Sequence, residues 1–368
     1  MRPENARLAR LRGSIEPVDV GARGIESVAR NVECLRLRAI VIAGLTPTVV
    51  VKRILGGVPD AMSPFAMTLS QSFERRLLAN AGGSLLTAYR EKGVLTQAEA
   101  KIGSIADVAS GDSPIARLSR EQETQRLVAL KRAGDPEARN LILKPQLPLT
   151  LVGVTHSIEL DYLVSADADP FYRVGVIKSY ADRGGKTDKS DIRSACREAV
   201  VGTLALQQLL EADGHDPELT GDSVDLILRA PGSFTPRLFP AMRAQSELAS
   251  LRRALTSAPR DIEGIEQLIP SGQTLATPGV LDQLPNRYRS SCKEHCALWE
   301  RCRAQAQADA HPVILGDQAA ELLAAAGSLD RAVDLLNGTG RPPENQAQAR
   351  LAEDMRQAAD LLDRIANV

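Results

Sequence analysis

The sequence has no long apolar segment and few aromatic residues. Its longest apolar stretch, AIVIAGLTPTVVV, contains Pro47 and is shorter than the roughly 18 to 20 residues that a membrane helix requires. Arginines occur near the start, but no apolar segment follows them as it would in a secretory signal. Aromatic residues make up only 3%, so few side chains can stack on nucleic-acid bases. We therefore expect a cytoplasmic protein without a membrane partner.

A strong excess of charge is also absent. The formal net charge is -1 over 368 residues. This total argues neither for nor against a nucleic-acid partner, because such binding depends on a local basic surface. A chain of this length can bury a large core, so disulfides are not required for its stability.

Cysteine is scarce, yet it is clustered. Three of the five cysteines, Cys292, Cys296 and Cys302, lie within eleven residues in the hydrophilic stretch SSCKEHCALWERCR. In a reducing compartment this spacing indicates metal binding or redox chemistry before it indicates disulfides. Three thiolates leave a four-ligand site incomplete, so we expect a further ligand from elsewhere in the chain.

Helical and strand periodicities alternate along the chain, in the order of one α/β domain with helical arms. The predicted helices cover about residues 25–44, 63–93 with a break near Gly82, 120–134, 190–214 with Ser190 or Asp191 as N-cap, 241–258, 316–338 and 344–367. The predicted strands cover about residues 148–154, 157–165, 171–179, 223–230 and 235–241, and the second and third form a hairpin.

The predicted hairpin brings acidic and basic side chains together. Alternation in IELDYLV places Glu159 and Asp161 on one face of a strand, and VGVIKSY brings Lys178 up on the neighbouring strand. Metal-dependent phosphodiester hydrolysis needs carboxylates that hold Mg²⁺ or Mn²⁺ and a lysine that stabilises charge or positions the attacking water. An ordinary surface ion pair across a hairpin is the alternative.

Six short motifs follow one another along the chain. They are Cys34, Glu74 in SQSFERRLL, Asp161 in IELD, Lys178 in VIKS, the helix around CREAVVG, and the three clustered cysteines. In this order the chain resembles the PD-(D/E)xK nucleases of the RecB type. The resemblance is to the iron–sulfur branch, which includes the AddB nuclease domain and the CRISPR-associated RecB-like exonucleases. It spans about residues 30 to 303.

The resemblance implies an α/β fold with a PD-(D/E)xK, restriction-endonuclease-like core, a mixed central sheet, and helical N-terminal and C-terminal arms. Residues 1–60 would form the N-terminal arm that carries the first cluster cysteine, residues 61–303 the nuclease core, and residues 304–368 a helical tail. The implied activity is that of a Mg²⁺- or Mn²⁺-dependent deoxyribonuclease in DNA repair, recombination or defence. Its partners would be DNA and other proteins of such a system.

The resemblance also implies roles for particular side chains. The catalytic residues would be Asp161, Lys178 and Glu74. The Mg²⁺ or Mn²⁺ ligands would come from Asp161, Glu74, Glu159 and Glu198. A 4Fe-4S cluster, acting as a structural clasp, would be held by Cys34, Cys292, Cys296 and Cys302. Zinc is the alternative to the cluster, bound by four cysteines or by three together with His295.

The chain departs from the family pattern at several positions. Val176 stands two residues before Lys178, where the family has an acidic metal ligand, and Glu198 and Gly202 stand at the Gln and Tyr positions of the helix. Glu159 replaces a usual Gly, and the cysteine spacing is one residue longer than in the family. A Mg²⁺ ion held by fewer carboxylates binds more weakly, unless Glu159, Glu198 or Glu74 supplies the missing oxygen. The alternative is an inactive nuclease fold that binds nucleic acid or a protein partner.

Basic residues follow the hairpin in a glycine-containing loop and the next helix. The candidates for phosphate contacts are Lys186, Lys189, Arg193 and Arg197. A solvated loop without a ligand is the alternative.

Overall fold

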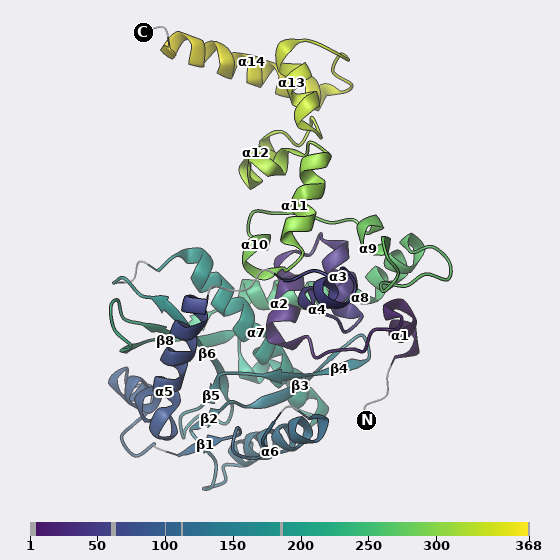
Figure 1. Ribbon diagram of the computed structural model, residues 1–368. Coiled ribbons are helices and arrows are strands. Elements are labelled where there is room, and N and C mark those ends of the chain that lie inside the picture. Colours follow the sequence, from purple (N-terminus) through teal and green to yellow (C-terminus); the bar gives the residue numbers. More distant parts are fainter. Residues whose placement is uncertain (1–4, 60–63, 100, 112, 185–186, 367–368) are drawn as a thin grey trace.

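The computed structural model describes residues 5–59, 64–99, 101–111, 113–184 and 187–366. A mixed six-stranded sheet lies at its centre, in the order β1-β2-β5-β6-β7-β8 (Figure 1). The β1/β2 and β6/β7 pairs are parallel, and the other three pairs are antiparallel. The strands are β1 (Ile102–Ser104), β2 (Leu141–Leu143), β5 (Tyr162–Val164), β6 (Arg173–Ala181), β7 (Ser223–Arg229) and β8 (Pro236–Arg243). The predicted α/β class with a mixed sheet is confirmed.

Two further strands, β3 (Gln146–Leu151) and β4 (Val154–Glu159), form a separate antiparallel ribbon. In the sequence β3 follows β2 and β5 follows β4. Two-residue interruptions of the strand structure, Lys144–Pro145 and Leu160–Asp161, separate the ribbon from the six-stranded sheet. Pro145 has no N–H to donate to a sheet ladder. The two breaks lie side by side, because the N–H of Lys144 donates to the carbonyl of Asp161 at 3.0 Å and that of Leu160 to Pro145 at 2.9 Å. The single strand predicted over 157–165 is therefore divided at the level of Asp161.

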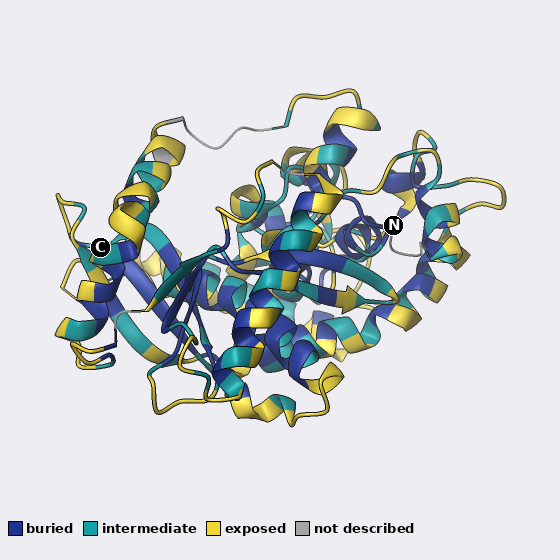
Figure 2. Cartoon of the chain, turned by 90° about the horizontal axis from the view of Figure 1, so that it is seen from below, coloured by how far each residue is buried: buried dark blue, intermediate teal, exposed yellow. Residues whose placement is uncertain are grey.

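Helices cover both faces of the sheet. On one face α7 (Lys189–Ala212), α6 (Pro114–Arg132), α2 (Gly21–Arg30) and α8 (Gln245–Leu268) share a core with Val174 and Val176 of β6. On the other face α5 (Pro64–Glu91) packs on Tyr162 and Ile177. Since side chains alternate along a strand, Val176 and Ile177 enter different cores. Figure 2 shows the strands mainly in the colours of buried and intermediate residues, and the helices striped from buried to exposed.

Several predicted helix boundaries are wrong. The helix expected over 316–338 is divided into α12 (Asp317–Leu322) and α13 (Leu329–Asn337), and the one expected over 241–258 begins only after β8 and extends to Leu268. The helix expected over 25–44 is divided into α2 and α3 (Leu35–Ile42), and Cys34 is the N-cap of α3. The helix α7 is capped by Asp188, whose carboxylate accepts from the N–H of Ser190 at 2.7 Å, instead of by Ser190 or Asp191. The expected break in α5 is present, with non-helical backbone at Ala79–Gly82.

The N-terminal helices pack on the chain that leads into the cysteine segment. Leu8, Ile40 and Val50 share a core with Ile262 and Leu298. Beyond it the C-terminal helices rise away from the sheet, and α13 and α14 share a small core of their own (Figure 1). The remaining helices are α1 (Ala6–Arg12), α4 (Pro47–Arg53), α9 (Val280–Gln283), α10 (Cys292–His295), α11 (Trp299–Ala308), α12 (Asp317–Leu322), α13 (Leu329–Asn337), α14 (Gln346–Ala366) and two 3₁₀ turns, Pro217–Thr220 and Pro312–Leu315. None of the helices described is both long and apolar enough to cross a membrane.

Candidate functional site

Three carboxylates meet at the breaks between the two sheets. Glu74 comes from α5, Glu159 from the end of β4, and Asp161 from the break before β5. All three face the ammonium of Lys144, which lies 3.3 Å from Asp161 Oδ1 and 3.9 Å from Glu159 Oε1 and forms an ion pair with Glu74. Burial opposes the charge of Lys144, but Asp161 and Glu74 outweigh it and raise its pKa. The structure thus brings together three of the predicted site residues around a lysine that was not predicted.

Asp161 is also tied to the next strand. Its Oδ2 accepts the backbone N–H of Ile177 at 2.7 Å. This contact fixes the carboxylate beside Lys178, the next residue of β6. The predicted neighbourhood of Asp161 and Lys178 is therefore present.

Lys178 forms an ion pair with Glu198 of α7, the helix that packs on this face of the sheet. Its Nζ donates to Glu198 Oε2 of α7 at 2.5 Å, and its side chain is 13% exposed. Burial acts to lower the pKa of Lys178, but Glu198 and then Asp161 outweigh it, so that the pKa is raised. Lys178 is therefore held as a cation between two carboxylates. Glu198 faces this lysine, whereas Glu74, Glu159 and Asp161 face Lys144.

Val176 cannot act as a ligand. Its side chain is buried in the core shared with Val174 and α7. The acidic function expected at this position is absent from β6.

A cavity of about 540 Å³ lies beside the carboxylates. Lys144 and Glu159 form one side of it. The other side is formed by Arg120 and the 106–111 loop, and Arg120 holds that loop by donating to the carbonyls of Ala109 and Gly111. The carboxylate of Glu159 and the ammonium of Lys144 therefore border an open cavity at the junction of the two sheets.

The four predicted cluster cysteines lie in one region of the fold. Cys34 lies close enough to Cys292, Cys296 and Cys302 for its charge to raise the pKa of each of them. Burial is the larger cause, and it contributes to pKa values of about 12 for Cys296 and about 11 for Cys302. All five cysteines are free thiols, and Cys196 of α7 is buried in the core between that helix and the sheet, where burial and Glu247, but no other cysteine, raise its pKa. In the described parts of the chain, no three or more His, Cys, Asp or Glu side chains are grouped so that they could hold a metal ion.

Residues that flank Cys34 donate to two of the other three thiols. Asn31 Nδ2 lies 3.7 Å from Cys292 Sγ, and Arg36 Nη1 lies 3.3 Å from Cys302 Sγ. The backbone of the same segment is held by the N–H of Arg36, which donates to the carbonyl of Pro285 at 2.9 Å. The segment around Cys34 therefore contacts the cysteine segment through both backbone and side chains.

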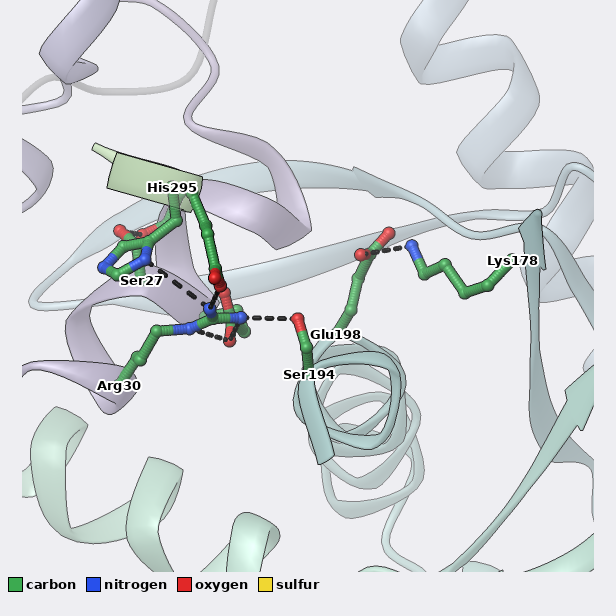
Figure 3. A network of polar contacts seen from close by, with 9 residues as sticks. Ser27, Arg30, Lys178, Ser194, Glu198 and His295 are labelled. Carbon is green, nitrogen blue, oxygen red and sulfur yellow. Dashed lines mark hydrogen bonds and ion pairs between the residues drawn. The ribbon is translucent and has the colours of Figure 1, made fainter. Parts of the chain in front are cut away.

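Arg30 connects the cysteine segment to the helix that carries Glu198 (Figure 3). Its guanidinium donates to Glu26 at 2.8 and 2.9 Å and to Ser194 Oγ at 2.5 Å, and it lies 3.5 Å from Nδ1 of His295. Ser194 faces Arg30 from α7, whereas Glu198, one turn later, faces Lys178. Burial, followed by Arg30, lowers the pKa of His295 to about 4. His295 is therefore neutral, and its Nδ1 faces Arg30 of α2.

The predicted phosphate-binding residues do not form one exposed group. Lys189 and Arg193 are exposed on α7, and Arg193 lies 3.5 Å from Glu247. Arg197 is half-buried, and burial together with nearby Arg30 lowers its pKa. Lys186 lies outside the described residues.

Sequence reasoning missed Lys144, Arg36 and Arg30. A signal for Lys144 is present in LILKPQL, where a single charge interrupts an apolar strand immediately before a proline. The two arginines lie within four residues of Cys34, but nothing in their spacing indicates which distant segment they contact.

Comparison with known proteins adds little to this geometry. No family model matches the chain, and no curated protein is similar enough to count as a match. A solved structure described as "Crystal structure of SSO0001" is similar over 60% of this chain and 95% of its own, at 15% identity and a TM-score of 0.23. At that level the similarity supports no conclusion about fold or function.

Proposed function

We propose that this chain is a RecB-like PD-(D/E)xK deoxyribonuclease that acts in the cytoplasm, uses Mg²⁺ or Mn²⁺, and holds a 4Fe-4S cluster on its four clustered cysteines. The observation that carries the proposal is the attachment of Asp161 to the N–H of Ile177, which sets its carboxylate beside Lys178. Glu74 and Glu198 belong to helices on opposite faces of the sheet, and they pair with Lys144 and Lys178, respectively.

The carboxylates supply donors of the kind that Mg²⁺ prefers. Glu74, Glu159 and Asp161 already surround one cation, the ammonium of Lys144. As they stand, the described side chains form no metal-binding group, but these carboxylates would hold a divalent ion in place of the ammonium. A bound ion would supply an activated water and neutralise charge on the scissile phosphate.

Lys178 is suited to stabilising negative charge. Because Glu198 and Asp161 outweigh burial and raise its pKa, it stays protonated near neutral pH and acts as a cation and not as a base. The hydrogen bond to Glu198 fixes the direction of the ammonium. Lys178 would therefore orient the phosphate and offset the charge that develops as water adds to phosphorus.

The surroundings of the cysteines favour an anionic group. Arg36 is only 1% exposed, and it has no ion pair with a carboxylate in the described part of the chain. Burial raises the pKa of Cys302, so a metal-free thiol would be neutral, and every hydrogen-bond acceptor of this guanidinium would then be uncharged, although the carboxylate of Asp282 is near enough for Arg36 to lower its pKa. Cluster binding would release the thiol protons to solvent, and the resulting thiolates would place negative charge beside this guanidinium. Cys34, Cys292, Cys296 and Cys302 would hold the cluster.

A catalytically inactive fold that binds DNA or a protein partner is the second candidate. The observation that favours it is Val176, because a buried valine replaces an acidic ligand and no neighbouring carboxylate on β6 takes its place. Cleavage assays separate the two candidates.

The test uses anaerobically purified protein, Mn²⁺, and linear single- and double-stranded DNA. We expect cleavage by the wild type and its loss in Asp161→Asn and Lys178→Met, with Asp330→Asn on exposed α13 as the control that keeps activity. Absence of cleavage by the wild type, or equal cleavage by all variants, contradicts the nuclease proposal.

The cluster has its own test. We expect Cys34→Ser to lose the absorbance at about 400 nm and the iron that the purified wild type contains. Cys196→Ser is the matched control, since this cysteine is also buried but no other cysteine contributes to the shift of its pKa. Zinc in place of iron would contradict the cluster and support the alternative metal.

A further inference from the structure

The ammonium of Lys144 lies among the carboxylates of Glu74, Glu159 and Asp161. Its partners come from three different elements, and its side chain is 22% exposed. Three negative charges face one positive charge, so the group retains a net attraction for cations. In a magnesium or manganese site, the divalent ion is surrounded by carboxylates, as Nζ of Lys144 is here.

The backbone shows that the position of Lys144 is specified. Its φ of 51° lies in the left-handed region, which is unfavourable for residues other than glycine, asparagine and aspartate. Its N–H donates to the carbonyl of Asp161 at 3.0 Å, while its Nζ reaches the carboxylate of the same residue. Both ends of Lys144 therefore bind Asp161, and the chain accepts local strain to maintain this arrangement.

There is room for the ammonium to leave. Lys144 and Glu159 line the cavity of about 540 Å³ beside the site. Lysine has a long flexible side chain, so Nζ can move into this space without a change of the backbone.

We propose that Lys144 is an internal cation that occupies the metal position and competes with divalent ions for the carboxylates. The inference rests on the metal site of the proposed function. In the metal-free chain, Lys144 offsets the repulsion among Glu74, Glu159 and Asp161. A divalent ion binds only when it displaces Nζ, so Lys144 sets the metal concentration at which the site fills.

The experiment measures Mn²⁺ binding without DNA, at fixed ionic strength, by the electron paramagnetic resonance signal of free Mn²⁺. We expect Lys144→Met to bind Mn²⁺ at least about tenfold more tightly than the wild type, because it removes a positive charge at close range. Lys144→Arg keeps the charge and should not tighten binding. Lys52→Met removes the same charge from an exposed position on α4 and should leave the affinity unchanged. Asp161→Asn should weaken binding in each background.

A second measurement reports on folding. In the presence of a chelator, Lys144→Met should unfold at a lower temperature than the wild type, and Mn²⁺ should raise its unfolding temperature by more than it raises that of the wild type. Equal or weaker Mn²⁺ binding in folded Lys144→Met overturns the inference, as does absence of Mn²⁺ binding in both proteins. Tighter binding in Lys144→Met without any DNA cleavage upholds the inference and counts against the nuclease activity.

Discussion

The guanidinium of Arg36 donates a hydrogen bond to Cys302 Sγ, with Nη1 3.3 Å from the sulfur. Its other acceptors are the carbonyls of Asp282 and Leu284, both at 3.2 Å, and Gln305 Oε1 at 2.9 Å. All of these acceptors are uncharged. A fully buried positive charge with neutral acceptors is costly unless an anion lies beside it.

We predict that Arg36→Met weakens retention of the cluster. Removing the counter-charge and a hydrogen bond to sulfur should lower the iron content per chain after aerobic purification and make the reduction potential more negative. Arg38→Met is a matched control, because Arg38 is also buried on α3 but pairs with Asp261. Unchanged iron content and potential in Arg36→Met would show that the guanidinium has only a structural role.

The ion pair between Arg30 and Glu26 should be important for stability. Both side chains are largely buried, and burial raises the pKa of Glu26 even with Arg30 beside it. Arg30→Met leaves this carboxylate without its partner and should lower the free energy of unfolding by about 3 kcal/mol. Arg126→Met breaks an exposed pair with Glu123 and should cost less than about 1 kcal/mol. Urea denaturation compares the two variants, and equal losses would contradict the prediction.

Gly175 should tolerate no side chain. A Cβ at this position would lie 1.9 Å from Cζ of Tyr162, a fully buried ring whose hydroxyl accepts from Tyr89 at 3.1 Å. Gly175→Ala should therefore cost at least about 3 kcal/mol of unfolding free energy. The control is Gly264→Ala in α8, where a Cβ meets nothing within 4 Å and alanine should stabilise the helix by about 1 kcal/mol. Equal unfolding temperatures for Gly175→Ala and Gly264→Ala would contradict the prediction.

Glu99 should make stability depend on pH. Burial acts to raise the pKa of its carboxylate, but hydrogen bonds from the backbone N–H groups of Asp167 and Thr96 outweigh burial, so that the pKa is lowered. A carboxylate with a lowered folded-state pKa contributes stability above its unfolded value of about 4.3, and this contribution disappears as pH falls through the folded value. The difference in unfolding free energy between the wild type and Glu99→Gln should be larger at pH 7 than at pH 3. A difference that does not change with pH would contradict this assignment.

Local patterns in the sequence predicted much of the fold. Two-residue alternation predicted a strand over about 171–179, and the structure has β6 there, because side chains of a strand repeat every two residues. The expected hairpin is present as the antiparallel β5–β6 pair. Cys34 was misplaced, because the helical periodicity on both sides of it runs through a turn that local spacing does not reveal.

Local sequence pattern predicted less of the candidate site than of the fold. Asp161 and Lys178 are near one another because their strands are neighbours, and this was predictable. The position of Lys144 was not, since it depends on a chain break that aligns with the break at Asp161. Glu74 and Glu198 join from helices on opposite faces, and their approach depends on how each helix packs on the sheet.

By itself the sequence determined the class of side chains available: carboxylates and a lysine on neighbouring strands, and thiols in a hydrophilic segment. Periodicity is a property of adjacent residues, so it is contained in the sequence pattern. Only the tertiary structure decided which cation the carboxylates surround and which guanidinium lies against Cys302. These contacts join segments far apart in the chain, and they arise from packing of separate elements around common cores.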